Sequence, residues 1–209
     1  MTFIRQGYKD KGLDKEDLNT DPVIQFESWF EEAKKSEPIP TAMSLSTVNN
    51  NGEPTLRTVL LKLFDKKGFV FFTNYKSRKA DHIADNPNVA VLFNWVTIER
   101  QVSIAGVAEK IKTKESIKYF MSRPRGSQLG AWVSDQSSVL SSRKILELKL
   151  EEIKRKFSDG EIPLPDFWGG YRIIPKTFEF WQGRPNRLHD RFIYSKQSNE
   201  LWEIDRIAP

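Results

Sequence analysis

The sequence predicts a mostly β protein with added helices (an α+β fold), arranged as a small antiparallel barrel. Short apolar runs rich in β-branched and aromatic residues follow one another and are separated by Asn-, Asp- and Gly-containing turns. Only a few helical patterns interrupt these runs, which favours one curled sheet over alternating helices and strands. The 209 residues suit a single domain with its own core, and the 14 Phe and 6 Trp residues supply a large aromatic interior or interface.

The first half of the chain predicts one helix followed by strands. Residues 1–20 are polar and are expected to form a tail. A helix should follow, because Asp21 is a favourable N-cap, Pro22 suits the first turn, and apolar residues recur at helical spacing over 23–33. A short helix opens at residues 77–79 and ends before Pro87. The expected strands cover 42–48, 55–64, 69–73, 89–95 and 100–111, with turns at 49–52 and 65–68.

The second half predicts further helices and then the last strands. A helical pattern begins near Thr113, is interrupted at Pro124 and continues weakly to Val133. A longer amphipathic helix is expected over 142–157, and its inward stripe consists of Leu146, Leu150, Ile153 and Phe157. The last strands are expected near 170–182, 190–195 and 201–206. No internal repeat or linker divides the chain.

Composition excludes several classes of protein. No apolar run approaches the 18 residues of a membrane span, and the N-terminus lacks the apolar segment of a secretory signal. The absence of Cys excludes disulfides and thiolate chemistry and fits the cytoplasm. With only two His residues, a metal site is not expected. Neither a Walker A loop nor a Rossmann glycine motif occurs. The net charge of +5 is compatible with nucleic acid or with phosphorylated small ligands.

A basic segment near the C-terminus is the first candidate site. If residues 187–191 are extended, Arg187, His189 and Arg191 share one face, and Leu188 and Phe192 share the other. Two guanidiniums beside an imidazole can bind an anion and hold or pass a proton. A solvent-facing edge strand would show the same spacing.

Three other segments carry groups suited to phosphate. Ser77, Arg78 and Lys79 open a helix, where backbone N–H groups and the dipole favour anions; an ordinary capped surface helix is the alternative. Strict alternation over 57–62 puts Arg57 and Lys62 on opposite faces, so they would serve two neighbouring ligands, or one ligand if a bulge re-aims a side chain. A helix end and turn could bring together Tyr119, Arg123 and Ser127, although this could be only a basic loop.

Together these segments resemble the pyridoxine/pyridoxamine 5′-phosphate oxidase family over nearly the whole chain. The matching motifs, in order, are R-T-V-L-L-K (57–62), S-R-K (77–79), E-R-Q (99–101), Y-F-M-S-R-P-R-G-S-Q-L-G-A-W (119–132), Q-S-S (136–138), F-W-G-G-Y-R (167–172), W-Q-G (181–183) and R-L-H-D-R (187–191). Each motif alone is weak, but their joint order and spacing are specific.

The resemblance implies an FMN-binding split β-barrel of antiparallel Greek-key type over 21–209, which acts as a homodimer with FMN sites between subunits. It implies that FMN contacts Arg57, Thr58, Val59, Leu60, Leu61, Lys62, Phe72, Thr73, Arg78, Lys79, Gln101, Gln136, Ser137, Trp181 and Arg191. The phosphorylated pyridine substrate would contact Arg5, Gln6, Gly7, Tyr8, Lys62, Tyr119, Arg123, Ser127, Arg187, Leu188 and His189. Arg187 and His189 would be the catalytic pair over the substrate ring, and residues 1–20 would close the pocket.

The implied reaction is oxidation of pyridoxamine or pyridoxine 5′-phosphate to pyridoxal 5′-phosphate, with O2 reduced to H2O2. A split-barrel flavin reductase with a nicotinamide donor would share the FMN contacts but would not need the Tyr119, Arg123 and Ser127 group. A binder of nucleic acid or of a phosphorylated vitamer would also fit the basic charge. The cations are spread over separate elements, which suits two discrete phosphates better than a nucleic-acid strand.

Overall fold

The computed structural model describes Tyr8 and residues 12–209. The helices, with 3-10 turns written η, are η1 Lys15–Asp17, α1 Pro22–Ser36, α2 Arg78–Asp85, η2 Val96–Ile98, α3 Thr113–Met121, α4 Arg125–Val133, α5 Arg143–Lys156 and η3 Pro185–Arg187. The strands are β1 Ala42–Val48, β2 Pro54–Leu60, β3 Leu63–Asp65, β4 Gly68–Asn74, β5 Asn88–Trp95, β6 Arg100–Lys110, β7 Trp168–Gln182, β8 Asp190–Lys196 and β9 Trp202–Arg206. No described helix is long and apolar enough to cross a membrane.

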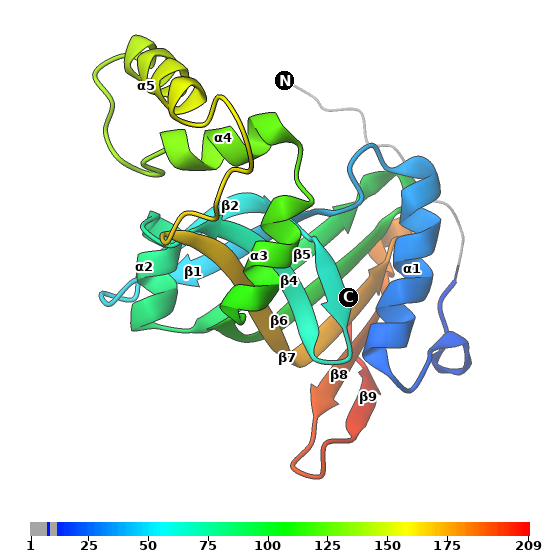
Figure 1. Cartoon of the computed structure of the whole chain (residues 1–209). Helices are drawn as coiled ribbons and strands as arrows, with labels where there is room; N and C mark the ends of the chain where they lie inside the picture. Colours follow the sequence, from blue (N-terminus) through cyan, green and yellow to red (C-terminus); the bar gives the residue numbers. More distant parts are fainter. Residues whose placement is uncertain (1–7, 9–11) are drawn as a thin grey trace.

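The strands form one curled antiparallel sheet in the order β2-β1-β5-β6-β7-β4-β3, and β8 and β9 continue from β7 (Figure 1). The 15-residue strand β7 is the branch point: its first half pairs with β4 and its second half with β8. The pairing of β6 with β7 shifts register beside this branch: Ala105 pairs with Thr177 and Gly106 with Pro175, so Lys176 of β7 is the extra, bulged residue. A Cβ on Gly106 would lie 2.1 Å from the carbonyl oxygen of Ile174, so only glycine allows this close approach of the two strands.

Helix α1 covers the main core, as its sequence pattern predicted. The Asp21 side chain caps it by accepting a hydrogen bond from the Val23 N–H at 2.9 Å. Phe26 is fully buried, and its ring lies against those of Phe69 and Phe93 at 4.8 and 4.9 Å. This aromatic packing fixes the sheet on which the candidate site is built.

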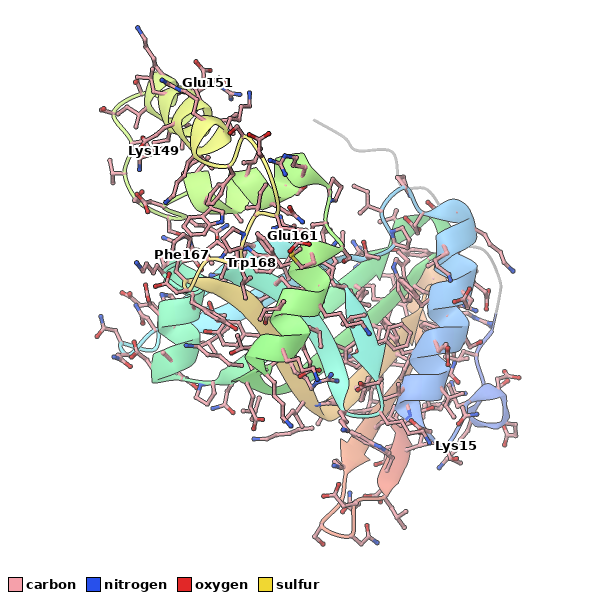
Figure 2. All side chains as sticks on the ribbon, in the orientation of Figure 1. Lys15, Lys149, Glu151, Glu161, Phe167 and Trp168 are labelled. Carbon is pink, nitrogen blue, oxygen red and sulfur yellow. The ribbon has the colours of Figure 1, made fainter. Side chains whose placement is uncertain are left out.

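A second apolar cluster holds α3 and α4 against the start of β7. Phe120 is fully buried within it, and Leu129 and Trp168 are nearly so. Figure 2 labels Trp168 between the sheet and the α4–α5 pair, which projects beyond the sheet in Figure 1. No side chain of α5 is fully buried; its predicted inward stripe is only half-buried, because the helix packs on α4 and not on the sheet. The cluster therefore positions α3 and α4 beside one end of the sheet.

One strand prediction was wrong. The expected strand 55–64 is two strands, because the Leu61 N–H bonds to the Thr41 carbonyl and the Lys62 N–H bonds to the Val70 carbonyl. The strand expected near 190–195 is present as β8, but the condition that residues 187–191 are all extended is not met, since η3 precedes β8 and Arg187 has a φ of 64°. The alternation arguments for residues 57–62 and 187–191 therefore do not hold.

The expected tail is also partly wrong for the described residues 12–20. Leu13 is only 5% exposed and belongs to the main core. Its N–H donates to Asp190 Oδ2 at 3.1 Å, and its carbonyl accepts from Arg206 Nη2 at 3.1 Å. Residues 12–20 are thus tied to the C-terminal hairpin of β8 and β9.

Candidate active site

The candidate site is a cavity of about 670 Å3 at the end of the sheet, between β2, β4, α2 and the α3–α4 segment. This volume is in the range of small-molecule and cofactor sites. It is lined by Arg57, Thr58, Val59, Leu60, Lys62, Phe72, Thr73, Asn74, Arg78, Lys79, Tyr119, Arg123, Ser127, Gly130, Ala131, Ser134, Gln136, Ser137 and Trp168. Five of these described residues are cations and none is an acid, so the cavity is suited to an anionic ligand.

The break between β2 and β3 brings Arg57 and Lys62 into one cavity. Had the strand continued, alternation would have separated them, as the sequence predicted. Leu61 instead turns into the core, where it is 3% exposed, and Lys62 remains exposed at the cavity. Strict alternation therefore does not apply over 57–62, and the alternative in which one of the two side chains is re-aimed describes the structure.

Lys79 is the most buried cation of the cavity, with 8% of its surface exposed. Its Nζ donates to Thr73 Oγ1 and Gln136 Oε1, each at 3.0 Å. Burial, and then the positive charges of Arg57 and Arg78, lower the pKa of Lys79 from 10.5 to about 8. An anion among these three cations would relieve their mutual repulsion.

The loop after α4 forms hydrogen bonds with two of these cationic residues, Arg78 and Lys79. Gln136 accepts hydrogen bonds from Thr73 Oγ1 and Lys79 Nζ, both at 3.0 Å. Ser137 Oγ accepts from the Arg78 N–H at 3.3 Å, at the first position of α2. That N–H is thus occupied by Ser137 and is not free to bind an anion.

Tyr119, Arg123 and Ser127 all line this cavity, and Tyr119 and Arg123 interact electrostatically with each other. The rings of Tyr119 and Phe72 are stacked with centroids 3.9 Å apart, and the Trp168 ring is nearly parallel to both, with its centroid 5.3 Å from that of Phe72 and 6.3 Å from that of Tyr119. The Arg123 guanidinium lies over Trp168 at 4.6 Å, and its buried Nη1 has no hydrogen-bond partner among the described residues. Burial lowers the pKa of Arg123, and burial raises the pKa of Tyr119 against a smaller opposing effect of Arg123.

A second group of predicted residues lies outside this cavity, on β6, β7 and β8. Gln101 and Arg191 both pair with Trp181, so the three lie side by side on adjacent strands. The His189 ring is 4.5 Å from the Trp181 ring, and Tyr8 lies edge-on to both at 5.2 and 5.6 Å. Arg191 is paired with Glu179 through Nε and Nη2, both at 2.8 Å.

A hydrogen bond to the backbone determines the tautomer of the neutral His189 ring. Its Nδ1 accepts a hydrogen bond from the Arg184 N–H at 3.1 Å, so the neutral ring carries its hydrogen on Nε2. Burial, followed by the charges of Arg187 and Arg191, lowers the pKa of His189, and Asp190 opposes this. Arg187 and Leu188 are exposed next to this ring. The group therefore presents a neutral imidazole among cations.

Two family models match the segments that carry these residues. The family described as "Pyridoxamine 5′-phosphate oxidase" matches residues 30–157, which include the cavity-lining segments up to Ser137. The region described as "Pyridoxine 5′-phosphate oxidase C-terminal dimerisation region" matches residues 168–209, which contain Trp181, Arg187, His189 and Arg191 of the second group. The chain belongs to the pyridoxamine 5′-phosphate oxidase family.

Relatives in this family match the chain from end to end. A protein of Rippkaea orientalis named pyridoxine/pyridoxamine 5′-phosphate oxidase is 63% identical over all of this chain and 99% of its own length. A protein of the same name from Crocosphaera subtropica is 60% identical over the same shares. The solved structure of PhzG from Burkholderia lata, in complex with tetrahydrophenazine-1-carboxylic acid, superposes with a TM-score of 0.89 at 25% identity, covering 96% of this chain and 99% of that one. An FMN-binding protein of Nostoc punctiforme shares the fold, with a TM-score of 0.73 at 18% identity over 90% of this chain and 97% of that one.

The family resemblance assigned more residues to the site than one cavity contains. The predicted residues that line it are Arg57, Thr58, Val59, Leu60, Lys62, Phe72, Thr73, Arg78, Lys79, Tyr119, Arg123, Ser127, Gln136 and Ser137. Those placed elsewhere are Tyr8, Leu61, Gln101, Trp181, Arg187, Leu188, His189 and Arg191. Arg5, Gln6 and Gly7 fall outside the described residues.

Sequence reasoning missed several lining residues, of which Trp168 is the largest. Trp168 was part of the F-W-G-G-Y-R motif, but no role was assigned to it. It carries both the stack with Phe72 and the contact with Arg123. Asn74, Gly130, Ala131 and Ser134 also line the cavity and carry no local signal that separates them from ordinary turn and helix residues.

Proposed function

We propose that this chain oxidises pyridoxamine 5′-phosphate and pyridoxine 5′-phosphate to pyridoxal 5′-phosphate, with FMN as cofactor and O2 as the acceptor that becomes H2O2. The observation that carries the proposal is a cavity with five cations and no acid, in a family whose relatives at 60 and 63% identity bear this oxidase name. Two phosphorylated ligands, cofactor and substrate, account for this excess of positive charge.

The donors of the cavity form two groups, each suited to one phosphate. Arg57, Arg78 and Lys79 interact electrostatically with one another, which makes them the candidate holders of the FMN phosphate. Arg123 and Tyr119 interact with each other and lie in the same lining as Lys62 and Ser127. The buried, unpartnered Arg123 Nη1 is a donor in need of an acceptor, and a substrate phosphate would supply one.

The chain's own residues bind and orient, while the redox chemistry belongs to the cofactor. FMN, when bound, would supply a two-electron acceptor for a hydride from C4′ of the substrate, with O2 as the final acceptor; for pyridoxamine 5′-phosphate, water would then supply the aldehyde oxygen and the amino group would leave as ammonia. Arg123, Tyr119, Ser127 and Lys62 anchor the substrate phosphate, and this fixes where the pyridine ring and its reacting C4′ carbon lie in the site. His189, with hydrogen on Nε2, can donate to an oxygen or nitrogen of the substrate without being charged.

The second group of residues completes the site only if it reaches a cavity in another subunit. Trp181, Arg187, His189 and Arg191 do not line the cavity of their own chain. They lie within residues 168–209, the part of the chain matched by the dimerisation region. We therefore infer a homodimer in which this C-terminal group of one protomer faces the cavity of its partner.

Product formation tests the proposal directly. The FMN-loaded protein is incubated in air with pyridoxamine 5′-phosphate, and pyridoxal 5′-phosphate, O2 consumption and H2O2 are followed together. One aldehyde and one H2O2 should appear for each O2 consumed, and unphosphorylated pyridoxamine should react far more slowly because Arg123 then lacks its acceptor. Equal rates for both amines would contradict the assigned phosphate group. Reduction by a nicotinamide donor without turnover of either vitamer would instead identify a flavin reductase.

A further inference from the structure

A buried polar network lies behind Arg57, on the side facing α2. Arg57 Nη1 donates to Thr47 Oγ1 at 2.7 Å and to the Leu45 carbonyl at 3.1 Å, and Nη2 donates to Thr55 Oγ1. Thr47 is fully buried and pairs with Thr55 across β1 and β2. Both hydroxyls also lie near His82 Nδ1, at 3.3 and 3.4 Å.

The direction of the hydrogen bonds follows from what each group can donate. A guanidinium only donates, so both threonine oxygens act as acceptors toward Arg57. Each hydroxyl then has one hydrogen left to place. Thr55 Oγ1 donates to the Thr47 carbonyl at 3.5 Å, the two hydroxyl oxygens are 3.3 Å apart, and His82 Nδ1 lies within reach of both. With the Thr55 hydrogen on the Thr47 carbonyl, the Thr47 hydroxyl is the donor to His82 Nδ1, and His82, only 7% exposed, then carries its own hydrogen on Nε2.

This arrangement connects the cation on β2 to the two cations on α2. His82 follows Arg78 by four residues and Lys79 by three, so it lies on the same side of α2 one turn further along. The hydroxyl pair spans the space between that helix and the β1–β2 hairpin. The placement of Arg57 relative to Arg78 and Lys79 is thus determined through His82.

We propose that His82 is a positioning residue that, through the hydroxyls of Thr47 and Thr55, fixes the Arg57 guanidinium for the phosphate of the cofactor. This inference rests on the proposed function, because the phosphate in question is that of FMN. His82 does not line the cavity, so its effect must pass through Arg57. A ligand with the same ring system but no phosphate should not sense it.

Binding of FMN and of riboflavin to the full-length apoprotein, measured by quenching of flavin fluorescence, tests the proposal. His82→Phe removes the acceptor but keeps a ring, and Thr47→Val removes one hydroxyl at nearly constant volume. Each variant should bind FMN about tenfold more weakly than the parent chain, which is the effect of losing one hydrogen bond to a charged network. Each variant should bind riboflavin with the same affinity as the parent chain. His82→Asn, whose Oδ1 takes the place of Nδ1, should recover most of the FMN affinity. Thr177→Val, a threonine on β7 outside the cavity lining, is the matched control.

A double-mutant cycle separates positioning from general damage. In an Arg57→Ala background, His82→Phe should have no further effect on FMN affinity. Equal losses for FMN and riboflavin, full FMN affinity in His82→Phe, or a loss that persists without Arg57 would each overturn the positioning role while leaving the proposed function intact. If the parent chain bound no FMN at all, the proposed function and this inference would fall together.

The tautomer of His82 gives a readout in the apoprotein that does not depend on flavin. The chain has only two histidines, so a long-range 1H–15N spectrum can be assigned with a His189→Gln variant. An unprotonated Nδ1 and a protonated Nε2 are expected for His82. A protonated Nδ1 would reverse the hydrogen-bond direction and would overturn the inference.

Discussion

Raising the pH from 7 to 9 is expected to weaken FMN binding by the apoprotein, because Lys79 loses its charge in this range. Burial and the charges of Arg57 and Arg78 lower its pKa to about 8. With that pKa, Lys79 is about 90% charged at pH 7 and about 10% charged at pH 9, so a phosphate that requires the charged form should bind about tenfold more weakly at pH 9. The phosphate itself is already a dianion throughout, since its second pKa is about 6.

Calorimetric titration with FMN at several pH values, in buffers of different ionisation enthalpy, measures both affinity and proton exchange. The bound phosphate raises the pKa of Lys79, so the complex should take up about one proton at pH 9 and almost none at pH 7. Lys79→Met should bind FMN weakly at both pH values and show no proton uptake. An FMN affinity that is unchanged between pH 7 and 9, or proton uptake that persists in Lys79→Met, would refute the reasoning.

Three further predictions address the substrate group, the C-terminal group and the core. Arg123→Met should raise KM for pyridoxamine 5′-phosphate about 10- to 100-fold, which is the effect of losing a charge-assisted hydrogen bond. An equal loss of FMN affinity would contradict the assignment of Arg123 to the substrate phosphate. Arg187→Ala should lower kcat on the order of 10²-fold through misplacement of the substrate ring, and a matching loss of FMN binding would count against that role. Phe26→Ala should lower the free energy of unfolding by about 3–5 kcal/mol in a urea titration, because the ring is fully buried among other aromatics; a loss below about 1 kcal/mol would contradict the assigned core.

Most elements of the fold could be predicted because their signals are local. The N-cap residue and the apolar stripe of helix α1 lie within one short stretch of the sequence, so the pattern alone predicts the helix. Asn, Asp and Gly mark the turns at 49–52 and 65–68. The break after Leu60 could not be predicted, since no turn residue marks it in R-T-V-L-L-K-L-F. Hydrogen bonds from Leu61 to Thr41 and from Lys62 to Val70 produce it, and both cross between elements.

The candidate site shows the same division. The resemblance named most of the residues that line the cavity, but composition and spacing alone left each segment with an ordinary alternative. His82 was missed because a single histidine on an amphipathic helix has no distinguishing pattern, and its partners Thr47 and Thr55 are 35 and 27 residues away. The separation of the C-terminal group from the cavity could not be derived from the motif either, because η3 and the positive φ of Arg187 replace the extended chain that the spacing implied.

The visible absorption spectrum of the FMN-loaded protein, recorded without oxygen as pyridoxamine 5′-phosphate is added, tests the central claim most directly. We expect the flavin absorption to bleach in proportion to the substrate added, up to one equivalent per FMN, and to return when air is admitted. A bound flavin that stays oxidised in the presence of excess pyridoxamine 5′-phosphate and pyridoxine 5′-phosphate would contradict the proposed oxidation.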